Sequence, residues 1–464
     1  MLFSTFMKRG DFAVKIVIAG DGKVGSALTR QLSAEGYDLT VIDNDAQVLE
    51  NTSEKYDILA VHGNCAAMQT LQDAGIEDAD LLIAVTSADE INLLCCMTAH
   101  GMNPNLHTIA RIRNPEYTEQ IYKMRELFAL SMIVNPERQA AAEIERLIKY
   151  PGFLKRESFA KGRLEIVELR LEAGSPLCNS SLSQMNEFLR CKVLVCAVIR
   201  NGESVTPGGY FVLREGDRLF VTAPTNNLAV LLKSMNIETR KVSKVIIAGG
   251  GRASFYLAQR LQHSGISVHL IEKEEEHCLQ LAEMLPDISV IYGDASDMSL
   301  LESEGLDQCD AMVALTGFDE TNIIMSLYAK SHGVPQVITK VGRMDSTIRN
   351  TLSLDSVISP RELCSNAIVQ YVRALQNQSG AALSVHSIAD GQAEAIEFRV
   401  ELDTLHCNEP LKKIRLRRNI LIAGISRRGR VEIPNGESSY LPGDSLVIVT
   451  SGDTVIHQLN DIFI

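Results

Sequence analysis

The chain repeats itself at a spacing of about 229 residues. "VIAGDGKVGSAL" (Val17–Leu28) and "VIIAGGGRASFYL" (Val245–Leu257) each place an apolar, strand-like run ahead of a glycine loop and a helix-like run behind it. The pairs that match in order along the chain are Gly20/Gly249, Gly22/Gly251, Asp43/Glu272, Gly63-Asn64/Gly293-Asp294, Thr86/Thr316, Asp89-Glu90/Asp319-Glu320, Asn92/Asn322, Gly202/Gly429, Pro207/Pro434 and Gly216-Asp217/Gly443-Asp444. One glycine motif arises easily by chance, but a collinear series does not. The sequence therefore predicts two copies of one unit.

Strand-like and helix-like segments alternate through the first part of the first copy. The predicted strands are Ile16–Ala19, Leu39–Ile42, Ile58–Val61, Leu81–Val85, Thr108–Arg111 and Leu130–Val134. The predicted helices are Val24–Ala34, Asp45–Lys55, Ala66–Ala74, Asp89–His100 and Pro115–Leu127, with a further one from Pro136, behind the N-cap residue Asn135, to about Lys149. Six short strands in this rhythm are typical of a Rossmann-type parallel sheet.

The pattern changes after this helix. Short alternating stretches at Leu164–Leu171, Val193–Ile199 and Arg218–Val221 are separated by turn signals such as Asn201-Gly202. We therefore expect an α/β fold with two Rossmann-like, doubly wound parallel-sheet domains, each followed by a small β-rich α+β domain. The predicted bounds are 1–14 for an N-terminal extension, 15–150 and 241–378 for the Rossmann-like domains, and 158–240 and 382–464 for the β-rich domains.

Composition excludes some classes of function. The formal net charge is −13 and there is no tryptophan. Nucleic-acid binding needs many lysines and arginines to neutralise phosphates, so no nucleic-acid partner is expected. The basic stretch Lys412–Arg418 is interpreted as a solvated helix face.

Cysteine spacing and hydropathy indicate the cellular compartment of the chain. The ten cysteines form no CxxC pair, so we expect no metal site and interpret most of them as reduced core residues of a cytoplasmic protein. No run of eighteen apolar residues is present to span a bilayer. The N-terminal apolar patch precedes Lys8-Arg9, which is the wrong order for a signal peptide. It is expected to be a disordered extension, with Met7 as an alternative start to Met1.

The first glycine loop has the pattern of a phosphate-binding turn. Gly20-Asp21-Gly22-Lys23-Val24-Gly25 is a complete GxGxxG between a strand and a helix, whose N-terminal N–H groups attract phosphate. Asp43, at the end of the second strand, is placed to accept hydrogen bonds from ribose hydroxyls. It favours NAD(H) over NADP(H), and it suits the ribose of ATP or ADP equally well.

The second loop is a less complete copy. In Gly249-Gly250-Gly251-Arg252-Ala253-Ser254, serine replaces the third glycine, which is expected to loosen the helix–strand contact slightly. Glu272 replaces the aspartate and is one methylene longer. This loop is interpreted as a second nucleotide site, with a degenerate copy kept for packing as the alternative.

Polar residues end the fourth and fifth strands of each copy. Thr86-Ser87 and Thr316-Gly317 end the fourth strand, where the carboxyl ends of strands line the ligand crevice. Arg111 ends the fifth strand and has the guanidinium geometry to bind phosphate. For Arg111 and its counterpart Lys340, a structural salt bridge is an equally good interpretation.

No catalytic constellation accompanies these loops. A dehydrogenase needs an acid/base group in a substrate pocket, and the only histidine near the first loop pattern, His62, is matched by Tyr292 in the second copy. No HExxH, GxSxG or Walker A motif is present. We therefore expect no catalytic residues and no enzyme activity.

The motifs and their order resemble a known family. "IVIAGDGKVG", "VIDNDAQVL", "LIAVTSADEINLLCC" and "IARIRNPEY" in the first copy, with "VIIAGGGRAS", "IYGDASD" and "VALTGFDETNIIMSLYAK" in the second, are similar to the TrkA family of peripheral NAD-binding regulatory subunits of Trk-type potassium uptake systems. In that family each Rossmann-like domain is an RCK N-terminal (KTN) domain and each β-rich domain an RCK C-terminal domain. The resemblance extends from about Lys15 to Ile464.

The resemblance implies a function and a set of binding residues. It implies a tetrameric ring on the inner face of the plasma membrane that docks on a TrkH/TrkG-like potassium translocator and gates it in response to NAD(H), or ATP and ADP. The helices behind Asn135-Pro136 and Ser359-Pro360 are candidates for contact between domains. Taken with the repeat, the candidate cofactor-binding residues are Gly20, Asp21, Gly22, Lys23, Val24, Gly25, Asp43, Gly63, Asn64, Thr86, Ser87 and Arg111 in the first copy, and Gly249, Gly250, Gly251, Arg252, Ala253, Glu272, Gly293, Asp294, Thr316 and Gly317 in the second.

Two other functions are compatible with the same residues. One is an NAD-dependent oxidoreductase, which predicts turnover of a reducible substrate. The other is a different soluble RCK-type ligand sensor, which predicts the same binding without the uptake partner. The missing catalytic constellation argues against the first, and the duplicated unit favours the uptake subunit over the second.

Overall fold

The computed structural model describes residues 14–237, 241–342, 352, 354–375, 382–451, 456 and 458–464. Residues 1–13 of the predicted extension, with both candidate starts, lie outside this set. The chain divides into two compact units. One comprises the described residues up to Gln139 together with Pro360–Tyr371, and the other comprises Ala140–Ser359 and the described part of Val372–Ile464.

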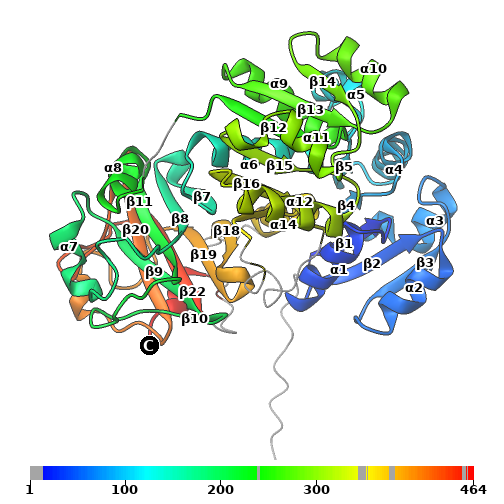
Figure 1. The fold of residues 1–464 in the computed structure, drawn as a ribbon. Coiled ribbons are helices and arrows are strands. Elements are labelled where there is room, and N and C mark those ends of the chain that lie inside the picture. The colour runs from blue at the N-terminus through cyan, green and yellow to red at the C-terminus, as the bar shows by residue number, and fades with distance from the viewer. Residues whose placement is uncertain are drawn as a thin grey trace, which may run out of the picture. The chain divides into compact units, whose positions relative to one another are not determined.

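The first unit contains a six-stranded parallel sheet in the order β3-β2-β1-β4-β5-β6 (Figure 1). Its strands are β1 (Lys15–Ala19), β2 (Asp38–Asp43), β3 (Leu59–His62), β4 (Leu81–Ala84), β5 (His107–Arg111) and β6 (Met132–Val134). The connecting helices are α1 (Gly25–Ala34), α2 (Ala46–Ser53), α3 (Met68–Asp73), α4 (Asp89–Met102) and α5 (Pro115–Lys123). This strand order places the switch point between β1 and β4, at the first glycine loop. The predicted Rossmann-type sheet is confirmed.

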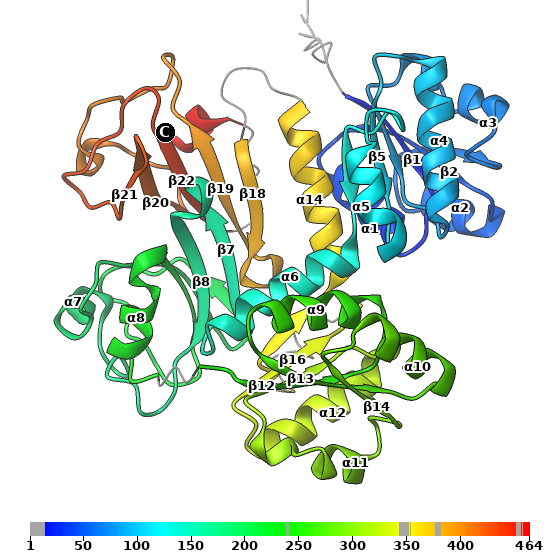
Figure 2. The ribbon, with the colours of Figure 1, turned by 90° about the horizontal axis from the view of Figure 1, so that it is seen from above.

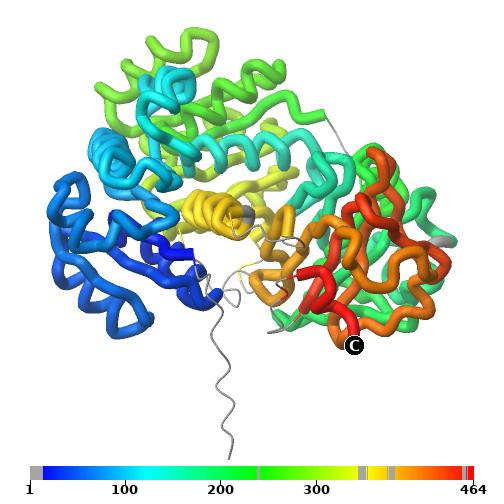
Figure 3. Tube along the Cα trace, turned by 180° about the vertical axis from the view of Figure 1, so that it is seen from behind, coloured from blue at the N-terminus to red at the C-terminus, as the bar shows by residue number. Residues whose placement is uncertain are grey.

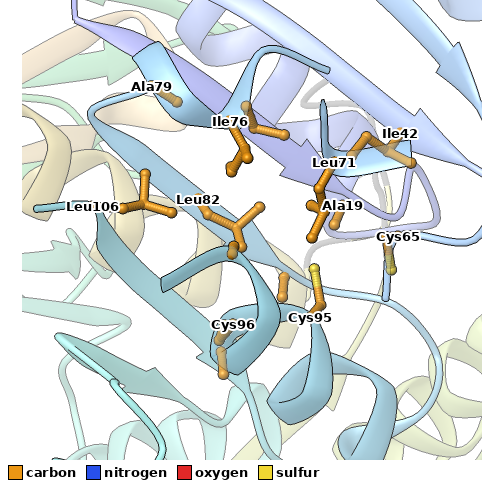
Figure 4. Packing of buried hydrophobic residues seen from close by; sticks show 14 of the residues in the cluster. Ala19, Ile42, Cys65, Leu71, Ile76, Ala79, Leu82, Cys95, Cys96 and Leu106 are labelled. Atoms are coloured by element: carbon orange, nitrogen blue, oxygen red, sulfur yellow. The ribbon is translucent and has the colours of Figure 1, made fainter. Parts of the chain in front are cut away.

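Buried side chains from the sheet and its helices form the core of this unit. Figure 4 shows Leu71 of α3, Leu82 of β4 and Cys95 of α4 among them. All ten cysteines are free thiols, and seven of them are buried, as the sequence predicts for most. The strands are short apolar runs because both faces of a parallel sheet are covered.

The second unit contains a parallel sheet with the same strand order, β14-β13-β12-β15-β16-β17. Its strands are β12 (Lys244–Ala248), β13 (Ser267–Glu272), β14 (Ser289–Tyr292), β15 (Ala311–Ala314), β16 (Gln336–Lys340) and β17 (Ser356–Ile358). The helices are α9 (Arg252–His263), α10 (Glu275–Met284), α11 (Met298–Ser303) and α12 (Asp319–Ser331). Helices α9 and α12 cover opposite faces of the sheet (Figure 2).

Two antiparallel sheets complete the second unit and lie side by side (Figure 3). The first contains β7 (Lys155–Phe159), β8 (Leu164–Arg170), β9 (Leu194–Arg200), β10 (Glu203–Val205) and β11 (Arg218–Pro224), with helices α7 (Met185–Phe188) and α8 (Leu228–Ser234). The second contains β18 (Ala382–Ile388), β19 (Ala393–Arg399), β20 (Ile420–Arg427), β21 (Arg430–Glu432) and β22 (Ser445–Ser451). One apolar cluster, with Phe159, Ile166, Phe220, Ile388 and Val447 among its members, joins both sheets.

The helices that follow the parallel sheets pass from one unit to the other. In α6 (Pro136–Lys149), the side chains of Ile144, Leu147 and Ile148 are fully buried in the second unit. There the Leu147 carbonyl accepts a hydrogen bond from Gln336 of β16 at 3.0 Å. Residues 360–371 of α14 (Pro360–Leu375) belong to the first unit. The predicted role of these helices in contacts between domains is confirmed for both, since Asn366 of α14 accepts a hydrogen bond from Gln31 of α1 at 3.1 Å.

Two local predictions were wrong. The basic stretch Lys412–Arg418 is not a helix face, because a single 3-10 turn ends at Lys413 and Leu416 then pairs with Phe463 as an isolated β-bridge. All five of its basic residues are exposed all the same. Helix α5 ends at Lys123 rather than Leu127, and turns follow up to Ala129, whose φ of +52° is incompatible with a continuing helix.

Candidate nucleotide-binding sites

The first glycine loop is held by its contacts with β2 and β4. Gly20 has a φ of +97°, and its N–H donates to the Ile42 carbonyl at 2.8 Å. A Cβ on Gly20 would lie 2.9 Å from the Thr86 backbone nitrogen, and one on Gly25 would lie 1.9 Å from the Gly20 oxygen. A Cβ on Gly22 would meet no atom within 4 Å. Packing therefore requires the outer glycines, and the middle one leaves the open approach that a pyrophosphate needs.

The predicted ribose acid also fixes the loop. Asp43 Oδ2 accepts the Asp21 N–H at 2.6 Å, and Oδ1 accepts the Asp45 N–H at 3.0 Å. The N–H of Gly63 donates to the Asp43 carbonyl at 2.9 Å, and the Asn64 side chain stabilises the turn that follows. The ends of β1, β2 and β3 thus meet at one residue, Asp43, through its carboxylate on the β1 side and its carbonyl on the β3 side. An acid here shapes the loop before any ligand is bound.

The remaining residues of the loop differ in exposure. Lys23 is exposed, while Val24 is buried and immediately precedes α1. Asp21 is almost completely buried. The structure therefore offers Lys23 to a ligand and turns the Asp21 side chain inward.

The end of β4 is organised by an asparagine on α4. Asn92 Oδ1 accepts the Thr86 N–H at 2.8 Å and the Thr86 hydroxyl at 2.7 Å, and its Nδ2 donates to the Arg111 carbonyl at 2.9 Å. The Arg111 guanidinium donates to the Thr86 carbonyl, and Arg113 donates to the Ser87 carbonyl. Burial, and then the neighbouring Arg113, lower the pKa of Arg111. At the edge of the crevice, Arg111 thus donates to a backbone carbonyl. The sequence had suggested phosphate binding or a structural salt bridge for this side chain.

The second loop keeps the strand contact and positive φ of its first glycine, and it differs from the first loop in its packing. Gly249 has a φ of +101°, and its N–H donates to the Ile271 carbonyl at 2.9 Å. A Cβ on Gly250 would lie 2.6 Å from both Glu272 Oε2 and Leu281 Cδ1, so these two side chains in their present positions occupy the space that it would need. A Cβ on Gly251 would meet no atom within 4 Å, as for Gly22. The second copy therefore keeps an open middle position.

Glu272 takes the place of Asp43 despite its extra methylene. Its Oε2 accepts the Gly250 N–H and its Oε1 the Glu274 N–H, both at 2.8 Å. The Gly293 N–H donates to the Glu272 carbonyl at 2.9 Å. Hydrogen bonds from the Ser296 backbone and hydroxyl lower the pKa of Asp294, which matches Asn64.

The serine in the third glycine position is accommodated because the helix starts earlier. α9 begins at Arg252, an exposed residue followed by the buried Ala253, so Ser254 is the third residue of its helix whereas Gly25 is the first residue of α1. Ser254 is fully buried, and its hydroxyl has no hydrogen-bond partner among the described residues. The polar replacement thus leaves a buried hydroxyl without compensation, which costs about 1–3 kcal/mol.

The end of β15 repeats the arrangement of β4. Asn322 Oδ1 accepts the Thr316 N–H at 2.9 Å and its hydroxyl at 2.8 Å, and Asn322 Nδ2 donates to the Lys340 carbonyl at 3.0 Å. Lys340 Nζ lies 3.4 Å from the Leu315 carbonyl, one residue before Thr316, whereas Arg111 donates to the carbonyl of Thr86 itself. A Cβ on Gly317 would meet no atom within 4 Å.

Sequence reasoning missed the two asparagines and Arg113. The signal for Asn92 and Asn322 was present, because both belong to the repeated T-x-x-D-E-x-N pattern. The two asparagine side chains hold the threonines in place and do not themselves face the crevice. Arg113 carried no such signal, since the matching segment after Lys340 has no arginine at the same spacing.

A cluster at the second site resembles a weak cation site. Glu272, Glu274 and His277 each place one ligand atom within 4.8 Å of the others. Glu272 already accepts two backbone N–H groups, and Glu274 is exposed. We assign no metal to this cluster.

Comparison with known families decides the relationship. The TrkA-N domain matches residues 16–136 and 245–360, and the TrkA-C domain matches residues 166–236. The chain is 34% identical over 454 residues to the Trk system potassium uptake protein TrkA of Vibrio alginolyticus, covering 96% of this chain and 94% of that protein. The chain belongs to the TrkA family. The TrkA protein of Haemophilus influenzae is 32% identical over 459 residues, covering 97% of this chain and 98% of the relative.

Solved structures show the same fold as this TrkA-family chain. The GsuK RCK domain aligns with a TM-score of 0.61 at 20% identity, covering 96% of this chain and 93% of that one. The GsuK channel bound to NAD aligns with a TM-score of 0.61 at 19% identity, covering 96% and 78%. Among the helices of the described residues, none is long and apolar enough to cross a membrane.

Proposed function

We propose that this chain is a nucleotide-sensing regulatory subunit that docks on a membrane potassium uptake translocator and gates it without catalysing a reaction. The observation that carries the proposal is the glycine loop fixed by a ribose-type acid, which is built twice with matching hydrogen bonds. Asp43 and Glu272 each hold the turn ahead of a helix N-terminus and lie at the carboxyl end of a second parallel strand. The relatives named as potassium uptake proteins support the transport role.

NAD(H) is the proposed ligand class, with ATP or ADP at one or both sites. A carboxylate at the ribose position accepts hydroxyl hydrogen bonds and repels a 2′-phosphate. Two structural neighbours are the GsuK channel bound to NAD and GsuK bound to ADP, which supports this ligand class. The proposed contact residues are those predicted from the sequence, with Asn92 and Asn322 added as positioning residues for the two threonines.

Gating requires two conformations with different nucleotide affinity. A ligand shifts such an equilibrium only by its differential affinity, typically about 1–3 kcal/mol of coupling. Two sites in each chain of a homo-oligomer would multiply this bias. We propose a tetrameric ring at the inner face of the plasma membrane. Mass measurement of the purified protein in solution and co-purification with a multi-spanning translocator test the ring and the docking separately.

Calorimetric titration tests the ligand proposal. The full chain is titrated with NADH, NAD, ATP and ADP alongside the Asp43→Ala and Glu272→Ala variants, with Asp38→Asn as a control for loss of an exposed acid on β2. Loss of one binding class in each variant is the expected result. Binding unchanged by Glu272→Ala would make the second loop a structural remnant, and absence of nucleotide binding would overturn the proposal. Substrate-dependent oxidation of NADH by the pure chain would favour the oxidoreductase instead.

A further inference from the structure

Asp21 is a buried acid inside the first glycine loop. Only 3% of its surface is exposed, although the loop itself faces the crevice. Its Oδ2 accepts the Thr52 hydroxyl of α2, and its Oδ1 is buried without a hydrogen-bond partner among the described residues. That oxygen lies 3.7 Å from the position of a Cβ on Gly25, the first residue of α1. An acid with one unpaired oxygen thus lies beneath the point where phosphate would bind.

The groups around Asp21 do not neutralise it. Burial raises the pKa of its carboxyl; the Thr52 hydroxyl opposes this effect, Asp43 adds to it, and the Thr29 hydroxyl of α1 opposes it. β2 therefore presents a second negative charge to this group, and the two helices present only hydroxyls.

Other titratable and charged groups lie near the loop without pairing with Asp21. Lys23 is exposed in the loop, and Asp45, the N-cap residue of α2, uses its carboxylate on the backbone of its own helix. His62 of β3 contacts the Asn44 carbonyl at 3.2 Å. Among these described contacts, no positively charged side chain compensates Asp21.

The second copy lacks this arrangement at each position. Gly250 matches Asp21, Ala258 matches Thr29, and Leu281 matches Thr52. Ala258 and Leu281 are buried as their polar counterparts are, and Leu281 occupies the space that a side chain on residue 250 would need. Three buried polar side chains in the first copy are therefore replaced by a glycine and two apolar side chains in the second.

We propose that Asp21 couples nucleotide binding at the first site to the uptake of a proton, and that Gly250 leaves the second site without this step. This inference rests on the proposed nucleotide binding. A pyrophosphate at the N-terminus of α1 brings negative charge towards a carboxylate that already faces Asp43. The complex then holds a proton on Asp21 more tightly than the free protein does. By linkage, affinity at the first site rises as pH falls.

NAD is the probe for the test because its pyrophosphate diester does not titrate near neutral pH. The full chain is titrated with NAD from about pH 8 to about pH 5.5, in buffers with different heats of ionisation, so that proton uptake is counted directly. Asp21→Asn removes the titrating group and keeps its shape. Asp38→Asn is the matched control, since Asp38 is exposed at the start of β2. Differences between variants cancel the contributions of His62 and of His277, which lies 3.7 Å from Glu272.

The expected result is an affinity at one site that rises with falling pH by at most about tenfold per pH unit, the limit for one proton. Asp21→Asn removes this dependence and binds NAD more tightly at the upper end of the range. Asp38→Asn behaves as the unmodified chain. Thr52→Val, which deletes the hydroxyl that stabilises the ionised acid, moves the dependence to higher pH and serves as the test if Asp21→Asn does not fold.

Two results would overturn the inference. NAD binding with no proton uptake in the unmodified chain overturns it and leaves the proposed function intact. Proton uptake that persists unchanged in Asp21→Asn does the same. Absence of NAD binding at every pH would remove both proposals together.

Discussion

The two copies keep the same strand order and differ in what is buried beneath their glycine loops. Both parallel sheets have the same strand order, and both organise a threonine with an asparagine from the following helix. Under the glycine loops, however, Asp21 and Thr52 face each other in one copy and Gly250 and Leu281 fill the same place in the other. The comparison teaches that backbone hydrogen bonds and glycine φ angles preserve a scaffold through duplication, while buried side chains are free to diverge as matched sets.

The β-rich domains diverge in a way that joins them. Arg218 of β11 donates to Glu168 at 2.7 Å and to Asp390 of the other copy at 3.0 Å. Its counterpart Ser445 makes a single hydrogen bond to Glu397, which matches Glu168. One copy therefore supplies a buried cation where the other supplies a hydroxyl. Two identical copies could not form this set of contacts.

Removing the buried cation that distinguishes the two β-rich domains should have the largest effect on stability. Arg218→Ala leaves Glu168 and Asp390 buried without their cation and is expected to lower the free energy of unfolding by about 3–5 kcal/mol. Ser445→Ala removes only one hydrogen bond and is expected to cost about 1 kcal/mol. Urea unfolding followed by circular dichroism measures both. Equal losses in the two variants would show that the asymmetry carries no energetic weight.

A second asymmetry predicts a pH dependence of stability. Glu157 of β7 and His386 of β18 occupy matching positions and pair at 2.7 Å, with Lys155 Nζ 3.0 Å from Glu157. Burial alone would raise the pKa of Glu157, but Lys155 and His386 together lower it to about 2. Because the pKa is depressed in the folded state, the stabilisation is complete above the unfolded value near 4.5 and is lost as pH falls towards 2.

The expected contribution is about 3 kcal/mol at neutral pH. Glu157→Gln should lose that amount near pH 7 and converge with the unmodified chain in acid. Urea midpoints over this pH range check it, with the exposed Glu203→Gln as a control. A constant difference between Glu157→Gln and the unmodified chain at all pH values would contradict the assignment.

Alanine at the third loop position sharpens the comparison of the two glycine loops. Gly25→Ala places a Cβ 1.9 Å from the Gly20 oxygen and is expected to cost about 2–3 kcal/mol. Ser254→Ala, at the matching position, removes an unpaired hydroxyl and is expected to be neutral or stabilising by about 1 kcal/mol. Thermal unfolding of the two variants gives the sign of each effect. A neutral Gly25→Ala would mean that α1 can shift to start earlier, as α9 does.

The smallest difference is expected where the copies agree. Asn92→Ala and Asn322→Ala each remove the hydrogen bonds that hold a threonine at the end of a strand, and each is expected to cost about 1–2 kcal/mol. Amide hydrogen exchange at Thr86 and Thr316 measures the loss locally. A several-fold larger increase in one copy would show that the shared geometry is not equally important in both.

Much of the architecture could be predicted from local patterns. Proline after Asn135 started α6 where expected, and the Asn201-Gly202 pair forms a turn with φ of +54° and +85°. The glycine loops, and Asp43 and Glu272 at the ends of β2 and β13, lie where their spacing predicted. The orientation of Arg111 towards a backbone carbonyl could not be predicted, because its choice between carbonyl and phosphate depends on where Thr86 lies in space.

The sequence by itself determined the duplication, the two parallel sheets and the position of each glycine loop. These depend on periodicity, glycine φ and helix caps, which act over a few residues. The tertiary structure alone decided that α6 buries Ile144 in the second unit, that Arg218 pairs with Asp390, and that Asp21 faces Thr52 beneath the loop. The reason is physical. Burial of a charge or an apolar face depends on partners tens to hundreds of residues away, and only docking of the elements brings those partners within contact distance.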